Sequence, residues 1–263
     1  MALYDSGVTY DTPGLFYDQG VTPDPPGDPV GWTDTGGGNH GGADWLIEAD
    51  LVVAGIHRNV GRFLVAPGVV VTLAPYDGSS LGELEVRAVD IEIAGALISS
   101  ALGYRGGAPG GAGEGPFGGA AGVDGGYLTG AGQGDVSTDT TGVKGSGGGG
   151  GSTQPGGAGG GLIRLFAKAA LRVPATGLIL AHGGPEGEAT AGHGAGGGVV
   201  LHCDGPYGVD IDGEVRTLGG GTLTANGGTL KEMATAGRLA VSGPTSAGRT
   251  YSDTTLRRGG VLA

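Results

Sequence analysis

The chain has 263 residues, of which 65 are glycine and one is cysteine, and its formal net charge at pH 7 is −12. That length allows one large domain with a hydrophobic core. The acidic charge would repel nucleic acid and anionic membranes, and no apolar run is long enough to span a bilayer, so we expect no nucleic-acid partner and no membrane insertion. The lone Cys203 rules out an intramolecular disulfide, and its alternating apolar surroundings predict a buried side chain.

Residues 1–31 differ from the rest of the chain in composition. They contain three Tyr-Asp pairs and a stretch with four prolines between Thr22 and Pro29. Proline is excluded from helix and strand interiors, so we expect an extended arm that ends in a stiff linker. Its tyrosines would serve as amphipathic anchors on a partner surface, and the alternative is a disordered terminus. The predicted anchoring residues are Tyr4, Asp5, Tyr10, Asp11, Tyr17 and Asp18.

Short runs of aliphatic and β-branched residues characterise residues 43–101. Apolar and polar residues alternate from Trp45 to Val53, and further runs occur at Val69–Leu73 and Val89–Ile93. Gly, Pro or Asp bounds each run, which is the pattern of strands, and helical periodicity is hard to find anywhere. We therefore predict an all-β protein.

Three segments align on Gly95, Gly177 and Gly213, with similar side chains two and four positions to either side. The matched sets are Ile91, Val173 and Val209; Ile93, Ala175 and Ile211; Leu97, Ile179 and Val215; and Ser99, Ala181 and Thr217. Each unit predicts a strand, a turn, a second strand, a glycine bend and a third strand. A glycine at the bend would let the chain turn where a Cβ obstructs it.

The repeat extends upstream of these glycines. Ile163–Ala167 aligns with Val199–Cys203 without a gap, and Leu84-x-Val86 matches the later part of Ile163–Ala167 with a one-residue slip. Units of this kind bury their inward side chains by stacking on each other. We predict a β-solenoid resembling a parallel β-helix, with an antiparallel β-sandwich as the alternative because the units are unevenly spaced. The predicted organisation is an arm at 1–31, a body at 32–102, a glycine-rich insertion at 103–161, and the remaining body at 162–263.

Glycine concentrates in the insertion 103–161, where it recurs partly every third residue. A polyproline-II strand advances three residues per turn, and glycine would allow such strands to pack closely. A polyproline-II bundle and an irregular surface loop are therefore equal alternatives. A second glycine-rich loop, 183–198, leaves the next repeat at the matching corner. We expect the two loops to form one face, which is where repeat proteins place binding surfaces.

The sequence carries no convincing catalytic or metal-binding constellation, so we predict no catalytic residue, metal or cofactor. Asp210 begins a calcium-loop-like run, but its twelfth position is Gly221 and lacks the carboxylate that an EF-hand needs. His182 and His193 lie near Glu186 and Glu188 in a glycine-rich loop, where polar loop side chains are the preferred interpretation. Paired carboxylates could act on glycans, but a structural role is favoured. The acids considered are Asp90, Glu92, Asp204, Asp210, Asp212 and Glu214.

Four aromatic residues lie in or near the glycine-rich parts, namely Tyr104, Phe117, Tyr127 and Tyr207. Aromatic rings on a glycine background can stack on sugars or fill an interface. They can equally hold the loops against the body. We predict that they contact a receptor or a neighbouring subunit, with the second role as the alternative.

Several of these segments resemble known phage proteins. The Tyr-Asp-Ser-Gly and Tyr-Asp-Gln-Gly repeats resemble the start of tailed-bacteriophage structural proteins. The block from Gly156 to Leu165, continued to Gly184, resembles glycine-rich β-helical phage and bacterial surface proteins. The period-three glycines are similar to those of tail-tip adhesins with polyproline-II bundles. The resemblance implies a place in the virion, an arm that docks on the particle, and a distal face exposed to the host.

The function expected from the sequence is that of a non-enzymatic virion structural or adhesive protein, as a tail fibre, tail tip or head decoration. Its partners would be other virion proteins, through the arm, and a host surface glycan. A homotrimer would cover exposed strand edges and multiply weak contacts. Met1–Asp5 shows no start of a signal peptide, so we expect release with the particle. The alternatives are a β-helical polysaccharide depolymerase and an ice-binding or cell-surface structural protein.

Overall fold

The computed structural model describes residues 31–116, 118–122, 144–185, 190–205, 207–217 and, for the backbone only, 238–242. The arm predicted for residues 1–31 lies outside these ranges except for Gly31. The described part is all-β, with 42% of its residues in strands and none in helices, and its strands form two largely parallel sheets. This confirms the predicted all-β class, and the described residues form no closed solenoid.

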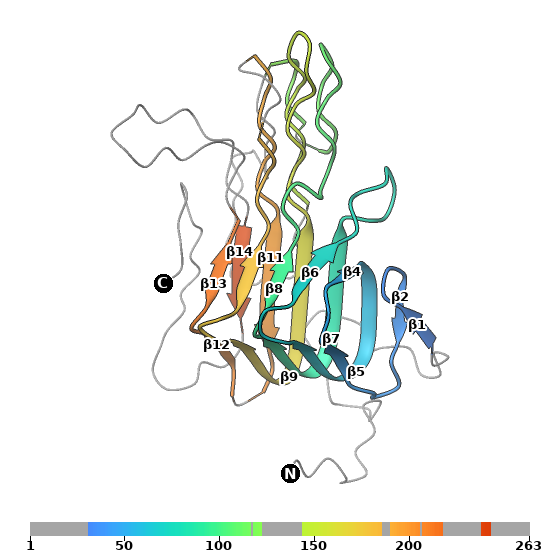
Figure 1. Cartoon of the computed structure of the whole chain (residues 1–263), viewed down its shortest axis with the longest axis vertical. Coiled ribbons are helices and arrows are strands. Elements are labelled where there is room, and N and C mark those ends of the chain that lie inside the picture. Colours follow the sequence, from blue (N-terminus) through green and yellow to red (C-terminus); the bar gives the residue numbers. More distant parts are fainter. Residues whose placement is uncertain are drawn as a thin grey trace.

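The first sheet has nine strands and the second has five (Figure 1). The strands of the first sheet are β1 (Gly31–Thr33), β2 (Gly37–Asn39), β3 (Trp45–Ile47), β5 (Gly55–Val65), β7 (Glu83–Ile93), β9 (Leu162–Val173), β11 (Gly198–Cys203), β12 (Val209–Ile211) and β14 (Arg238–Ser242). Those of the second are β4 (Leu51–Val53), β6 (Val70–Leu73), β8 (Ala96–Ile98), β10 (Leu178–Leu180) and β13 (Glu214–Arg216).

Nearly all strand pairs are parallel, because the chain returns to the same end after each strand. The first sheet runs in the order β1-β2-β5-β7-β9-β11-β14, with β3 on β5 and β12 on β9, and the second runs β13-β10-β8-β6-β4. Only the β1–β2 hairpin is antiparallel among the described pairs. The antiparallel sandwich considered from the sequence is therefore wrong.

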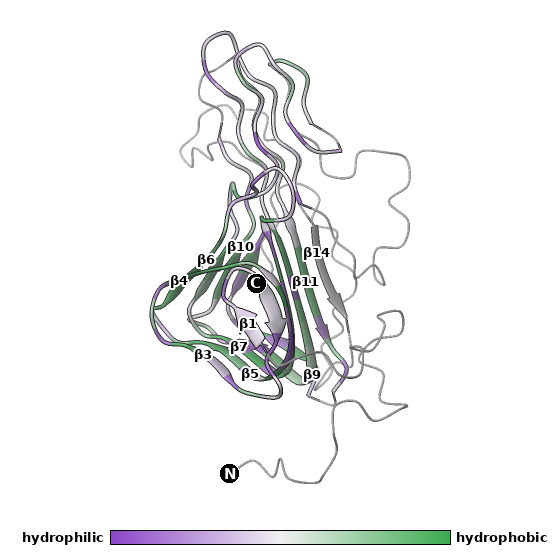
Figure 2. Cartoon of the chain, turned by 90° about the vertical axis from the view of Figure 1, so that its right-hand side faces the viewer, coloured by the Kyte–Doolittle hydropathy of each residue, from purple (hydrophilic) through white to green (hydrophobic). Residues whose placement is uncertain are grey.

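The core lies between the two sheets and consists of buried apolar side chains from both. Figure 2 marks the hydrophobic residues along these strands in green. In β7, Leu84, Val86, Ile91 and Ile93 are fully buried, while the alternate positions carry charged residues. This is the two-residue period expected of a strand with one buried face. Each such side chain contributes about 1.5–3 kcal/mol by its burial. Cys203 is buried too, as the sequence predicted.

The repeat register is confirmed in the second sheet and between β9 and β11 of the first sheet, and it is corrected between β9 and its neighbours β7 and β12. Ile179 pairs with both Leu97 and Val215, as predicted, and Ile163–Ala167 pairs in step with Val199–Cys203. Leu171, however, is the residue that pairs with both Ile91 and Val209. The predicted partner Val173 instead faces Ile211.

The cause of this two-residue error is a longer corner in the middle repeat. Val173 is followed by a turn in which the Gly177 N–H donates to the Pro174 carbonyl at 2.7 Å, and this turn uses two more residues than its counterparts. The same two extra residues explain the error in the upstream part of the repeat. The sequence alignment matched Leu84 to the later part of the run Ile163–Ala167, whereas Leu84 pairs with Ile163, the first residue of that run. The corner does require glycine, because a Cβ on Gly177 would collide with the Ile93 carbonyl of the preceding repeat.

A cluster of packed aromatic rings occupies the β1–β5 end of the first sheet. Its members are Trp32, His40, Trp45, His57 and Phe63. His57 Nε2 lies 3.1 Å from the Ala54 carbonyl, which can only accept, so His57 Nδ1 must accept from His40 Nε2 at 3.0 Å. This leaves the buried His40 Nδ1 without a hydrogen-bond partner among the described residues. Burial, and the neighbouring His57, lower the pKa of His40 to about 4.

Because burial also lowers the pKa of His57, both rings favour the neutral form in the folded protein. Stability from this pair is fully present above the unfolded-state pKa of about 6.5 and is lost as pH falls from there toward about 4. We predict a melting temperature several degrees lower at pH 5 than at pH 7.5, measured by circular dichroism. A His40→Phe variant, which keeps a flat ring beside Trp32, should lose much of that difference; an unchanged pH dependence would contradict the assignment.

Candidate functional site: the glycine-rich lobe

Residues 103–116, 118–122, 144–161, 181–185 and 190–197 lie together as one body, called here the glycine-rich lobe. It extends beyond one end of the two sheets (Figure 1). The chain enters it after β8 and returns at β9, then enters again after β10 and returns at β11. The two glycine-rich loops thus lie at one end of the sheets, as the sequence predicted.

Segment 144–151 forms the centre of the lobe, and it is hydrogen-bonded to neighbours on three sides. The first side of the segment consists of Gly145, Gly148 and Gly151, each of which donates one backbone hydrogen bond and accepts another. The donors to these residues are Tyr104, Gly107 and Gly110, and the acceptors from them are Gly160, Gly157 and Gln154, with N···O distances of 2.7–3.2 Å. Both ladders advance three residues per step.

The other two sides of this segment keep the same three-residue spacing. Gly147 and Gly150 donate to Glu114 and Gly111, and they accept from Gly119 and Gly122. Ser146 and Gly149 accept from Ala195 and Gly192. The hydrogen bonds on all three sides therefore share this three-residue spacing, and residues 145–151, which are all glycine except Ser146, are all buried.

Close approach of neighbouring backbones explains why this segment is almost entirely glycine. A Cβ on Gly149 would lie 1.8 Å from the Ala120 carbonyl oxygen, and one on Gly147 would lie 1.9 Å from that of Arg105. Both contacts are with backbone and cannot be relieved by a side-chain rotation. Ser146 is the one residue between Gly145 and Gly151 that carries a side chain, and it is 1% exposed.

The turns of the lobe that lie farthest from the sheets carry small and neutral side chains in their described parts. They are residues 108–111, 151–155 and 190–191, and in these residues no charge occurs. Ala108, Pro109, Thr153 and Gln154 are exposed there. These exposed turns stand on a framework held by many backbone hydrogen bonds.

Lys144 joins the base of the lobe to the sheets. Its ammonium group lies 4.8 Å from the ring centre of Tyr76 and 5.4 Å from that of Tyr104, and it donates to the Leu81 carbonyl at 3.2 Å. The two tyrosine rings meet edge to face at 5.0 Å. Burial, then Tyr76 and Glu83, raise the pKa of Tyr104, which keeps that ring neutral at physiological pH.

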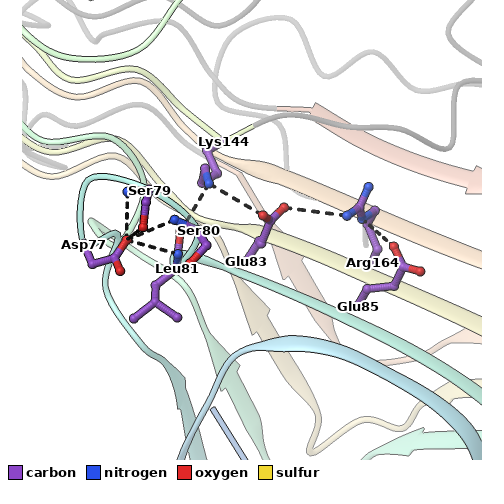
Figure 3. Close-up of polar contacts among 8 residues, drawn as sticks. All are labelled: Asp77, Ser79, Ser80, Leu81, Glu83, Glu85, Lys144 and Arg164. Carbon is purple, nitrogen blue, oxygen red and sulfur yellow. Dashed lines mark hydrogen bonds and ion pairs between the residues drawn. The ribbon is translucent and has the colours of Figure 1, made fainter. Parts of the chain in front are cut away.

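A row of alternating charges continues from Lys144 across the outer face of the first sheet (Figure 3). Lys144 lies 3.8 Å from Glu83, and Arg164 lies 3.6 Å from the other oxygen of Glu83 and 3.0 Å from Glu85. Arg87 binds Glu85 from the far side at 2.7 Å. The Glu85 side chain is only 7% exposed, so removing one arginine would leave a nearly buried carboxylate poorly compensated.

The turn beside this row is fixed by Asp77. One carboxylate oxygen accepts from the backbone N–H groups of Ser79, Ser80 and Leu81 and from the Ser79 hydroxyl, at 2.8–3.4 Å. The hydrogen bonds from Ser79 and Ser80 lower the pKa of Asp77 well below its usual range. Because Leu81 provides the carbonyl that Lys144 contacts, Asp77 helps to hold the lysine's acceptor in place.

The structure separates the residues that the sequence proposed as contacts. Tyr104 is partly buried against Tyr76 and Lys144 at the lobe base, which favours the anchoring alternative for it, and its contact with a receptor stays a prediction. Tyr207 lies apart on the sheet body and is 62% exposed. Phe117 and Tyr127 lie outside the described residues. So do the predicted anchors Tyr4, Asp5, Tyr10, Asp11, Tyr17 and Asp18.

Other candidates from the sequence do not converge on one centre. In the part of the chain that the structure describes, no three His, Cys, Asp or Glu side chains come close enough to hold a metal ion. His202 and Asp204 form a pair at 2.8 Å. Burial, then Arg216, lower the pKa of His182. Sequence reasoning missed Lys144, although it is the only lysine in 103–161 and precedes the central glycine run.

No family model matches the chain, and no curated protein or solved structure is significantly similar to it. Its described residues include no helix long and apolar enough to cross a membrane.

Replacing Gly149 by alanine should loosen the lobe. The new Cβ would press on the Ala120 carbonyl, and overpacking of this kind costs about 1–3 kcal/mol. Hydrogen exchange followed by mass spectrometry should show faster exchange in the lobe, with β7 and β9 unchanged. Gly31→Ala is the matched control because nothing lies within 4 Å of its added Cβ. Equal protection in both variants would refute the role of close backbone contact.

Replacing Lys144 by methionine should weaken the attachment of the lobe to the sheets. The change keeps an unbranched apolar chain but removes the contacts to Leu81, Tyr76 and Tyr104, for an expected loss of about 1–2 kcal/mol. Denaturant unfolding would measure it. Arg105→Met removes the same charge from an exposed lobe residue and should change stability by less than about 0.5 kcal/mol. Similar losses in both variants would show that the Lys144 contacts contribute nothing specific.

Proposed function

We propose that this chain is a non-enzymatic structural and adhesive protein of a virion. In this proposal the two sheets are a scaffold, the distal turns of the lobe contact a host surface or a neighbouring subunit, and residues 1–31 dock on the particle. The observation that carries it is the three-sided hydrogen bonding of segment 144–151. A framework tied this densely holds the exposed turns in place before binding, so that less conformational entropy is lost on contact.

The same proposal includes a finer description of the fold. We infer that the chain follows the path of a β-solenoid, because it alternates between the two sheets and adds parallel strands in step. We also infer that the lobe is a polyproline-II bundle. Its hydrogen-bond ladders advance three residues per step, which matches the three residues per turn of that helix.

The resemblance to phage proteins supports a virion location, and the arm and homotrimer belong to the same proposal. Purified particles should contain the chain, detected by mass spectrometry, and antibodies against it should label the particle surface in electron micrographs. Sedimentation of the purified full chain should give three times the chain mass. Absence from purified particles would refute the virion assignment, whereas a monomer would refute only the trimer.

The lobe turns should determine adhesion. The double variant Ala108→Arg and Gln154→Arg adds two bulky charges to exposed distal turns. It should reduce binding of the purified chain to host cells at least about tenfold, because the neutral residues at 108–111 and 151–155 that would fit a surface tolerate added charge poorly. The control Glu48→Arg makes the same net charge change at an exposed site on the sheet body and should bind as the unmodified chain does. Equal binding by both variants would place adhesion elsewhere.

A further inference from the structure

A groove of about 720 Å³ lies on the first sheet, in a part of the body that the lobe proposal does not use. Its volume falls within the range typical of small-ligand sites. Polar and aromatic side chains line it from three strands and two loops. They are Asp44, Arg62, Asp90, Glu92, Arg172 and Tyr207.

The groove is hollow because small residues lie between these longer ones. Gly61 and Ala170 both line it, on β5 and β9. A Cβ on Gly61 would lie 2.5 Å from an Asp44 carboxylate oxygen, so the loop before β3 is packed directly against that strand. The same Asp44 oxygen accepts from the Arg62 backbone N–H at 2.8 Å, which fixes its position. The loop and strand therefore form a preset wall.

Charged side chains of both signs alternate across neighbouring strands of the groove. Arg62 on β5 pairs in register with Asp90 on β7, and Glu92 on β7 pairs with Arg172 on β9. An ion pair of 2.8 Å joins Arg62 to Glu92, whose side chains are 46% and 31% exposed. Parallel strands are about 4.8 Å apart, so these groups form a row about 10 Å long of fixed donors and acceptors.

Tyr207 adds an apolar surface to one side of this row. It is 62% exposed, which leaves much of its side chain open to a ligand. A tyrosine ring is amphipathic, with an apolar face for stacking and a hydroxyl for hydrogen bonds. It comes from the loop before β12, and β12 pairs with β9 beside Arg172.

We propose that this groove binds a neutral oligosaccharide. A sugar ring offers one apolar face to Tyr207 and hydroxyl groups that both donate and accept, which suits carboxylates and guanidinium groups held side by side. An anionic ligand is disfavoured because the groove has three carboxylates against two arginines and the chain carries a charge of −12. An apolar ligand would cover these charged groups and remove them from water without forming hydrogen bonds to them, which is costly. The groove is thus a glycan site separate from the lobe.

The test titrates the purified full chain by calorimetry with neutral hexose and N-acetylhexosamine oligomers, a sialylated oligosaccharide and an oligolysine peptide. At least one neutral oligomer should bind, and the sialylated sugar and the peptide should not. Tyr207→Ala should weaken that binding about tenfold, as expected for the loss of an exposed aromatic contact. Tyr207→Phe is the matched control, because it keeps the ring and should bind within about twofold of the unmodified chain. Arg172→Ala should also weaken binding, through its hydrogen bonds.

The proposal is overturned if no neutral oligomer binds at millimolar concentration, if the sialylated sugar or the peptide binds instead, or if binding survives both Tyr207→Ala and Arg172→Ala. The lobe variant with Ala108→Arg and Gln154→Arg should bind the oligomer normally. Failure of the lobe proposal and failure of the groove proposal are therefore distinguishable. Chromatography of the bound oligomer completes the test: intact sugar agrees with a binding groove, while shortened products would show that a bound sugar is cleaved and would refute the non-enzymatic assignment.

Discussion

Direct contact between backbones, without intervening side chains, is the constraint on which the lobe depends. Segment 144–151 is hydrogen-bonded on three sides. At positions such as Gly147 and Gly149, a single added methyl group would clash with the carbonyl oxygen of a neighbouring segment. Burial of apolar side chains cannot stabilise such a body, because it has few of them. Its order comes instead from backbone hydrogen bonds, each of which contributes modestly but would be costly to leave unmade in a buried segment.

The parallel sheets and the lobe are two consequences of one chain path. Parallel strands need a connection that carries the chain back to the same end. At one end the corners are short, and glycine such as Gly177 fits beneath the carbonyl of the preceding repeat. At the other end the connections from β8 to β9 and from β10 to β11 are long, and their described residues lie side by side as the lobe. The position of the lobe therefore depends on the register of the strands. Lys144, through its contact with Glu83 and the neighbouring Arg164, helps to hold the base of the lobe on the first sheet.

Two separate surfaces follow from this arrangement. The lobe presents exposed neutral residues within 108–111 and 151–155 on a hydrogen-bonded framework, whereas the groove presents charged side chains from three strands. The strand register places Arg62, Glu92 and Arg172 side by side, although they are far apart in the sequence. Neither surface requires a large motion, because both consist of groups that hydrogen bonds or strand pairing already hold.

The sequence by itself determined the fold class, the inward alternation and most of the repeat, because a two-residue apolar period and glycine corners are local features. It located Leu97, Ile179 and Val215 in one layer, since nothing intervenes between each of them and its aligned glycine. Tertiary structure alone decided the pairing of Val173, where a longer corner shifted the register. It also decided that the period-three glycines form regular backbone hydrogen-bond ladders and not irregular loops. It likewise decided which side chains Lys144 and the groove residues contact. Those outcomes depend on which backbone lies beside which, and that information is spread over the whole chain.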